Sequence, residues 1–403
     1  MALQGRKLVT AMCVAQVCNL LPHVVVPAIM AQHLMPLWHL SAAQAGLMAS
    51  AYAFGYMLAV PILTALTDRF DARGILLAGS AVSGLGTIAF GLFADGLLSA
   101  SLLWAIAGAG FGGAYMPGLK ALTDRLPAGD ASRNVTLYTS SFSVGVGFSF
   151  LVAQLTADHF GWRVAFIATG LAPIAMVIVS AMLAPFKPTP APGHPLDFRP
   201  VFRNRTALGY ILGYGVHCFE LYGMRTWLVA YWSFVVARQS GDVWLGPIAV
   251  SVLVSVLSLP ASVLGNEASI RFGRHRAVTA IMLASGTLAL AIGFGATLPI
   301  VVLLPLLFLY AFTVPGDSGS LTAGMSQSAV PANRGATMAL HSTVGFGLSA
   351  LGAWGMGVAL DAAGGPASAT GWQAAFALLA VGTLLGPLAL FWSRKAGQHE
   401  AAD

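Results

Sequence analysis

The chain has 403 residues, of which 57% are hydrophobic and only 8% are charged. Soluble domains carry roughly 25% charged residues, so this composition excludes a soluble globular protein and indicates an integral membrane protein. The three cysteines all lie in apolar runs without His or Cys at ligand spacing, which indicates packing residues.

Twelve apolar stretches are each long enough for a transmembrane helix, which needs about 20 residues. In chain order they occupy 8–31, 44–66, 74–94, 97–119, 135–157, 163–184, 206–232, 244–266, 277–296, 298–320, 335–360 and 372–392. We therefore predict an all-α membrane protein with 12 transmembrane helices.

The basic residues predict the orientation of these helices. Seventeen of the twenty Lys and Arg residues lie before the first run, after the last, or in every second link, which alternate crossings place on one side. Arg163 and Arg238 lie on the other side, and Arg225 falls inside a run. The positive-inside rule then predicts that both termini are cytoplasmic. This topology accounts for the net charge of +6, so the charge gives no reason to expect nucleic-acid binding.

The longest link, 186–205, is rich in proline and polar residues, which bar a helix from crossing it. It divides the chain into six-helix bundles at 1–185 and 206–393, followed by a cytoplasmic tail at 394–403. The bundles echo each other, since Arg133-Asn-Val-Thr136 corresponds to Arg334-Gly-Ala-Thr337. A pseudo-symmetric repeat of six and six helices around a midplane site is typical of secondary transporters.

The link after the second run reads Asp68-Arg-Phe-Asp-Ala-Arg73, and the link after the eighth ends in Arg271-Phe-Gly-Arg274. Both resemble the G-x-x-x-D-R-x-G-R-R signature of the major facilitator superfamily, in its two expected places. Thr64 and Asp71 replace the glycines of the first copy, and Ile270 replaces the acid of the second. The resemblance covers the whole chain, with a slight likeness to cyanate- and nitrate-type permeases. It implies gating roles for six residues: Asp68, Arg69, Arg73, Arg271, Gly273 and Arg274. Each Arg is equally well explained as a topology anchor.

By the same resemblance, the first, fourth, seventh and tenth helices line a central cavity, and a single chain is the working unit. Helical periodicity of about 100° per residue tests this independently. It places polar or aromatic side chains on one face of each of these helices. They are Gln16, Asn19 and His23; Trp104, Phe111 and Tyr115; Tyr210, Tyr214 and His217; and Tyr310 and Asp317.

The ionisable residues inside the predicted helices are the strongest candidates for a role in transport. Of fourteen acids, only Glu220 and Asp317 lie well inside a run, where an ionised side chain costs from about 2.5 to over 10 kcal/mol. Glu220, with His217 or Asp317, is suited to carrying a proton. Arg225 keeps its charge and presents a fork that fits carboxylate, phosphate or similar anions. Alternatively, Glu220 and Arg225 neutralise each other, although their i, i+5 spacing sets them about 140° apart around the helix.

We therefore expect a secondary transporter for a small anionic solute, coupled to protons if it is coupled at all. Arg225, the polar residues of the first helix and the aromatic residues named above would bind the solute. The alternative is a proton-coupled exporter of amphipathic organic compounds, which the aromatic faces favour. No cofactor, metal site or enzyme activity is expected, because P-loop, H-E-x-x-H and G-x-S-x-G motifs are absent. The predicted location is a multi-pass membrane protein, in the inner membrane if the chain is bacterial.

Overall fold

The computed structural model describes residues 3–127, 131–188, 197–239, 245–330 and 333–400. Part of the predicted linker, 189–196, and the end of the predicted tail, 401–403, lie outside these ranges. All regular secondary structure of the described residues is helical, as the sequence predicts.

The first predicted span is a broken helix. It consists of α1 (Gly5–Asn19), turns over 20–24, α2 (Val25–Ile29), the π-helical turn η1 (Met30–Leu34) and α3 (Met35–Trp38). Pro22, at the break, and Pro27 and Pro36, beyond it, have no backbone N–H to donate, so a regular hydrogen-bond ladder cannot continue through them. The break leaves His23 in non-helical backbone at the centre of the molecule.

The other helices of the N-terminal half (residues 3–188) begin at recognisable caps. A capping box of Ser41 and Gln44 starts α4, and the Asp71 side chain accepts from the N–H of Arg73 at the start of α5. Such side chains satisfy amide groups that have no partner inside the helix. The helices are α4 (Ala42–Leu66), α5 (Ala72–Phe93), α6 (Leu97–Gly112), α7 (Tyr115–Thr123), α8 (Ala131–Phe160), α9 (Trp162–Leu171) and α10 (Ile174–Met182).

The C-terminal half (residues 197–400) contains the longest unbroken helix, α12, which spans 32 residues. Its tenth predicted span is interrupted by the 3₁₀ turn η3 (Val314–Asp317), at Pro315 and Gly316. The helices are α11 (Arg199–Arg203), α12 (Arg205–Val236), α13 (Pro247–Phe272), α14 (Arg274–Phe294), α15 (Ile300–Thr313), α16 (Ser318–Ser328), α17 (Arg334–Ala362), α18 (Ala369–Thr383) and α19 (Leu385–Glu400).

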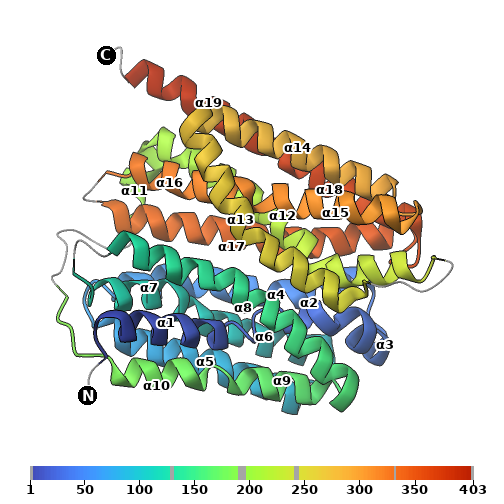
Figure 1. Cartoon of the computed structure of the whole chain (residues 1–403), viewed down its shortest axis with the longest axis horizontal. Coiled ribbons are helices and arrows are strands. Elements are labelled where there is room, and N and C mark those ends of the chain that lie inside the picture. The colour runs from blue at the N-terminus through green and yellow to red at the C-terminus, as the bar shows by residue number, and fades with distance from the viewer. Residues whose placement is uncertain (1–2, 128–130, 189–196, 240–244, 331–332, 401–403) are drawn as a thin grey trace.

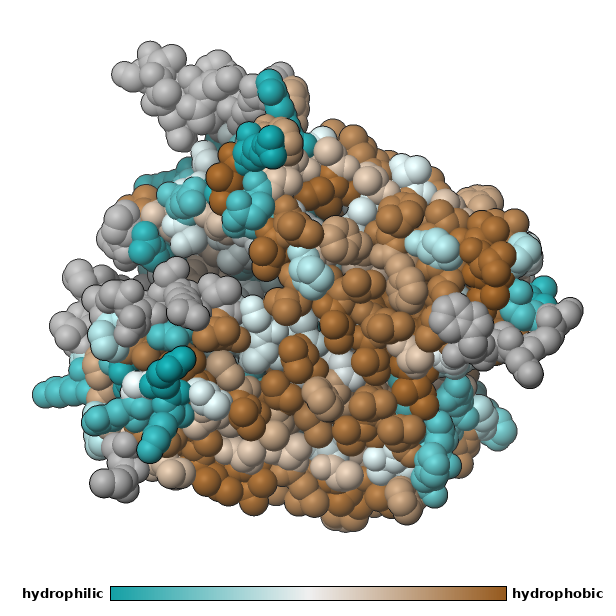
Figure 2. Space-filling view, in the orientation of Figure 1, coloured by the Kyte–Doolittle hydropathy of each residue, from teal (hydrophilic) through white to brown (hydrophobic). Residues whose placement is uncertain are grey.

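In Figure 1 the long helices run roughly side by side, with the N-terminal half below and the C-terminal half above. The start of α1 and the end of α19 lie at the same end of the molecule, called the near end here; the start of α4 lies at the opposite, far end. The visible face is dominated by apolar residues between two more polar ends (Figure 2). Large apolar side chains such as Phe93, Leu98 and Val301 are exposed, which fits contact with lipid.

Ten helices or consecutive helix pairs of the described residues are long and apolar enough to cross a membrane. The first predicted span, which is broken, and α12 are outside this set. At 1.5 Å per residue, α12 would extend about 48 Å, more than the hydrocarbon core of about 30 Å. Its polar side chains, rather than its length, keep α12 outside this set. The total of twelve spans stays a prediction.

The two halves touch along α4 and α17, α8 and α13, and α2 and α12. Near the middle, the Tyr56 and Phe346 rings stack with centroids 3.7 Å apart. At the far end, Asp361 of α17 accepts hydrogen bonds from the amides of Ala42 and Ala43, at 2.9 and 2.7 Å. A carboxylate of one half thereby caps the first turn of a helix of the other half.

Candidate functional site

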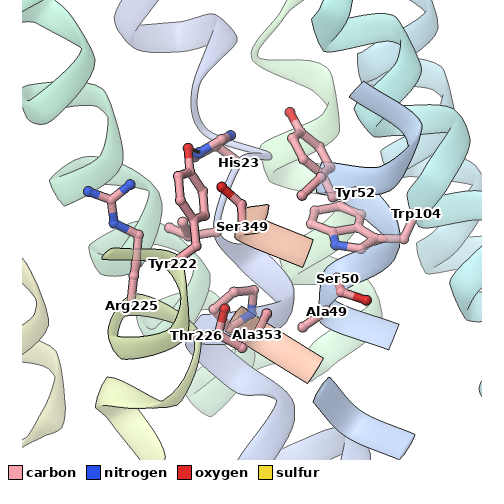
Figure 3. A pocket seen from close by; sticks show the side chains of 13 residues that line it. His23, Ala49, Ser50, Tyr52, Trp104, Tyr222, Arg225, Thr226, Ser349 and Ala353 are labelled. Carbon is pink, nitrogen blue, oxygen red and sulfur yellow. Dashed lines mark hydrogen bonds between the residues drawn. The ribbon is translucent and has the colours of Figure 1, made fainter. Parts of the chain in front are cut away.

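A small enclosed cavity lies between the two halves, near the break in the first span (Figure 3). Its volume is about 20 Å³, which is room for about one water molecule. The structure is therefore closed around this point. The lining residues are His23, Val24, Pro27, Ala49, Ser50, Tyr52, Ala53 and Trp104 from the N-terminal half, and Tyr222, Arg225, Thr226, Ser349 and Ala353 from the C-terminal half.

Of the described residues that line the cavity, Arg225 alone carries a permanent charge. Its side chain comes from the middle of α12, is 8% exposed, and lies over the Tyr222 ring at 5.2 Å from the centroid. Its Nη1 atom has no hydrogen-bond partner among the residues that the structure describes. Among the described residues, no carboxylate forms an ion pair with Arg225. A buried and unpaired guanidinium is unfavourable unless an anion joins it.

The opposite wall is aromatic. His23 packs against the Tyr52, Phe111 and Tyr222 rings at centroid distances of 5.3, 5.2 and 6.0 Å. Its Nε2 atom lies 3.3 Å from the Tyr222 hydroxyl, while Nδ1 has no partner. Trp104 completes this wall, 4.8 Å from Tyr52, with its Nε1 also unpartnered.

Glu220, His217 and Asp317, called the acid cluster here, lie inside the C-terminal half and not on the cavity wall. Glu220 accepts from the Ser285 hydroxyl at 2.7 Å, and His217 Nδ1 lies 2.6 Å from Asp317 Oδ1. The helix break at η3 brings Asp317 to this position against α12. Both carboxylates predicted inside the membrane are therefore engaged within one half, away from Arg225.

Two further aromatic residues predicted in the site lie near the acid cluster. The Tyr214 ring stacks between His217, at 5.5 Å, and His341, at 3.8 Å. Tyr310 is fully buried and lies near Glu220. The described residues contain no group of three or more His, Cys, Asp or Glu side chains arranged to hold a metal ion.

The remaining predicted site residues are distributed around these two centres. Phe111 and Tyr115 lie behind His23, with Tyr115 stacked between Phe111 and Tyr138. Gln16 accepts from the Tyr138 hydroxyl at 2.9 Å. Asn19 is fully buried, and neither polar atom of its side chain has a partner. These residues do not line the cavity itself.

Tyr210, predicted in the site, lies instead near the near end of the molecule. Its ring is 5.5 Å from His275 and 5.9 Å from the guanidinium of Arg274. Arg274 also donates to Gln327 at 2.9 Å. Gly273 adopts a φ of 89° between α13 and α14, a conformation that favours glycine. Within the C-terminal half, the second signature thus links α14 to α12 and α16.

In the first signature, the strongest contacts belong to Asp71 rather than Asp68. Arg125, from the link after α7, donates to both carboxylate oxygens of Asp71, at 2.7 and 3.0 Å. The amide of Phe186 donates to the same group at 2.9 Å. Burial alone would raise the pKa of Asp71, but the hydrogen bonds from Arg125, Phe186 and Arg73 outweigh it and hold the pKa below its ordinary value.

The other residues of the first signature make fewer contacts. Burial raises the pKa of Asp68, which lies near Lys120 and Asp124. Arg73 donates to the carbonyl of Leu183 at 2.8 Å, whereas Arg69, like Arg271 in the second signature, is exposed.

Four residues that line the cavity were not expected from the sequence: Tyr222, Tyr52, Thr226 and Ser349. Tyr222 lies three residues before Arg225, a spacing that places the two on one helix face, so the sequence contained a usable signal. Tyr52 belongs to the second span, which the family resemblance does not assign to the cavity. Its ring contacts His23, which belongs to the break at 20–24.

The sequence profile of the Major Facilitator Superfamily matches residues 12–353 of the chain. The chain belongs to the Major Facilitator Superfamily. It is accordingly a multi-pass membrane protein of a transporter superfamily and not an enzyme.

Relatives of this superfamily member are named as transporters of several compounds. The niacin transporter NiaP of Acinetobacter baylyi is 28% identical over 142 residues, 35% of this chain and 32% of that protein. The gallate transporter of Pseudomonas putida is 30% identical over 165 residues, 40% and 36% of the two chains. Human monocarboxylate transporter 11 is 30% identical over 210 residues, 50% and 42%. The chain thus spans less than half the length of these relatives.

Solved structures of transporters share the fold over almost the whole length. A bacterial homolog of the human lysosomal transporter Spinster, in an inward-facing and unoccupied conformation, superposes with a TM-score of 0.77 at 16% identity, covering 96% of each chain. A peptide transporter in complex with alafosfalin gives a TM-score of 0.78 at 13% identity, covering 99% of this chain and 97% of that one. At these identities the likeness shows the fold alone.

Proposed function

We propose that the chain transports small organic carboxylates by alternating access, with its N-terminal and C-terminal halves rocking around the cavity. One observation carries the proposal: Arg225 is buried on the cavity wall with an unpartnered Nη1 atom. A guanidinium does not lose its proton, and no carboxylate of the described residues pairs with this one, so an anion that enters the cavity would compensate its charge.

A carboxylate is the anion favoured by two further observations. The planar guanidinium fork matches the geometry of a carboxylate, and the aromatic wall suits a ligand with an apolar body. The relatives named above are niacin, gallate and monocarboxylate transporters, and these names all denote carboxylic acids. The competing function, export of amphipathic cations, is supported by the aromatic wall but opposed by the charge of Arg225.

We assign proton coupling to the acid cluster. His217 and Asp317 are 2.6 Å apart, and Glu220 is bonded to a neutral hydroxyl, so each group can change protonation without breaking an ion pair to Arg225. The cluster lies on α12 and at η3, and α12 also carries Arg225. A movement of α12 would therefore shift both Arg225 on the cavity wall and the residues of the acid cluster. We place the near end, with both termini, in the cytoplasm.

The experiment is to record internal pH with an entrapped dye in proteoliposomes while small carboxylates, or amphipathic cations, are added outside. The wild type should move protons in response to at least one carboxylate, and Glu220→Gln should not. The conservative variant Asp95→Asn, at an exposed helix start, serves as control and should behave as the wild type. A response to cations alone, with none to carboxylates, would favour the exporter and contradict the proposal.

A further inference from the structure

Three buried polar atoms without hydrogen-bond partners belong to residues that line the same cavity. They are Nη1 of Arg225, Nε1 of Trp104 and Nδ1 of His23. The exposed fractions of the three residues are 8%, 0% and 4%. Leaving a buried polar group unsatisfied costs about 1–3 kcal/mol. Three such atoms around one cavity therefore indicate a site built for a polar ligand.

The donors of this site belong to different halves. Trp104 comes from α6 and lies beside Tyr52, whereas Arg225 comes from α12 and lies beside Tyr222. In Figure 3 the two pairs stand on opposite sides of the cavity. The indole N–H and the guanidinium can only donate hydrogen bonds. A ligand that satisfies both walls must therefore carry an acceptor at each end.

The space between the two donors is bounded by the rings of Tyr52, Tyr222 and His23. Faces and edges of aromatic rings favour a flat ligand body, which can stack or meet them edge-on. Only one end of the ligand needs a charge, because Trp104 is neutral. The second acceptor is thus an uncharged atom, such as a ring nitrogen or a hydroxyl or carbonyl oxygen.

We propose that the substrate is a planar aromatic carboxylate with a neutral acceptor at the end opposite its carboxylate, and that Trp104 selects it through its indole N–H. This inference rests on the proposed role of Arg225 in binding the carboxylate. Such a ligand bridges the N-terminal and C-terminal halves. It requires the two walls to stand further apart than they do here, because the present volume of about 20 Å³ holds about one water molecule. A carboxylate without the second acceptor leaves the Trp104 N–H unsatisfied and binds more weakly.

The test compares acids of nearly equal size and charge. Dissociation constants of benzoate, pyridine-2-carboxylate, pyridine-3-carboxylate and pyridine-4-carboxylate are measured by calorimetry on the full-length protein at pH 7. At least one of the 3- and 4-isomers should bind about tenfold more tightly than benzoate. The 2-isomer should bind like benzoate, because its nitrogen is next to the carboxylate and cannot reach the opposite wall.

Trp104→Phe keeps a ring on the wall and removes the donor. We expect the ratio of the dissociation constants of benzoate and the favoured pyridine acid to fall from about tenfold to about one in this variant. Thermal unfolding of the variant, measured beside the wild type, shows that it is folded. The control is Trp162→Phe, since Trp162 packs against Phe166 and Phe90 and not on the cavity wall. This variant should retain the preference for the pyridine acid.

The outcomes separate this inference from the function on which it rests. If all four acids bind the wild type equally, or if Trp104→Phe keeps the preference, the assignment of Trp104 is wrong and carboxylate transport stands. If none of the four acids binds, the inference fails together with the proposed function.

Discussion

The N-terminal and C-terminal walls of the cavity differ in chemistry although they belong to halves with a repeated sequence pattern. The N-terminal wall offers neutral groups, the rings of His23, Tyr52 and Trp104. The C-terminal wall offers Arg225, and the same helix continues to Glu220 and His217 of the acid cluster. The repeat thus gives the two halves a similar arrangement of helices. Individual residues of α12 give the C-terminal wall its charge. A ligand between the walls would be held by charge on one side and by rings on the other.

Of the changes that test this difference between the halves, we expect the largest effect, on proton movement, at the acid cluster. Asp317→Asn keeps the size of the side chain but removes the acid partner of His217, 2.6 Å away. Carboxylate-driven proton movement should fall by at least about a hundredfold, the scale on which a proton-transferring group acts. Exchange of labelled for unlabelled carboxylate, measured without a proton gradient, should change less than about threefold, because Arg225 is intact.

Asp158→Asn is the matched control for this prediction, because Asp158 pairs with His33 in a more exposed contact of 3.1 Å. It should retain proton movement. Proton movement that survives in Asp317→Asn would place coupling elsewhere and remove the functional contrast between the halves.

The N-terminal half is not free of charge everywhere: at the near end it contains an ion pair of Asp71 with Arg125. This pair tests whether the difference between the two halves is confined to the cavity. We expect this pair to stabilise the fold and not to bind substrate. Asp71→Asn should lower the free energy of unfolding at pH 7 by about 2 kcal/mol, the value of a hydrogen bond to a charged group. Thermal unfolding in detergent measures this, with Asp95→Asn, at an exposed position, as a control that should remain within about 0.5 kcal/mol.

The effect of Asp71 should also depend on pH. The pKa of this group is lowered in the folded protein, so its stabilisation is complete above the ordinary aspartate pKa of about 3.9. It is lost as the pH falls through the lower folded value. The difference between the wild type and Asp71→Asn should therefore shrink below about pH 4. A difference that grows in acid would contradict this role.

A smaller effect is expected at the far end, where a charge of the C-terminal half again meets neutral groups of the N-terminal half. Asp361→Ala removes the acceptor for the amides of Ala42 and Ala43. Loss of a helix cap costs about 1 kcal/mol, so these amides should exchange hydrogen about fivefold faster. Hydrogen–deuterium exchange of the first turn of α4 tests this, with the first turn of α5 as an internal control. Unchanged exchange at Ala42 and Ala43 would show that this contact does not hold the halves together.

The sequence predicted the helical fold well, because long apolar runs and basic links are sufficient to place helices in a membrane. It could not predict the break at 20–24, which depends on how Pro22 and Pro27 are accommodated in three dimensions. That break carries His23, whose ring contacts Tyr52 on the cavity wall. The predicted solute site contained both Tyr210 and Arg225, yet fifteen residues of helix separate them by about 22 Å. Periodicity identifies the face of a helix, but it does not say how far along that face a site extends.

The signature loops show a second limit of sequence reasoning. The motif pointed to Asp68, and Asp71 was noted only as a replacement of glycine. The structure gives Asp71 the bonds to Arg125 and Phe186, because an acid at this cap position also reaches the ends of α7 and α10. Partners that lie 54 and 115 residues away leave no local pattern in the sequence.

The most direct test of the central claim is the affinity of Arg225→Gln for benzoate, measured beside the wild type and the control Arg238→Gln at the exposed far end. Since the variant removes an unpaired buried charge, we expect it to unfold at an equal or higher temperature than the wild type. Its dissociation constant should rise by about tenfold to a hundredfold, while Arg238→Gln should match the wild type. If Arg225→Gln binds benzoate as tightly as the wild type does, Arg225 is not the anion-binding residue and the account is contradicted.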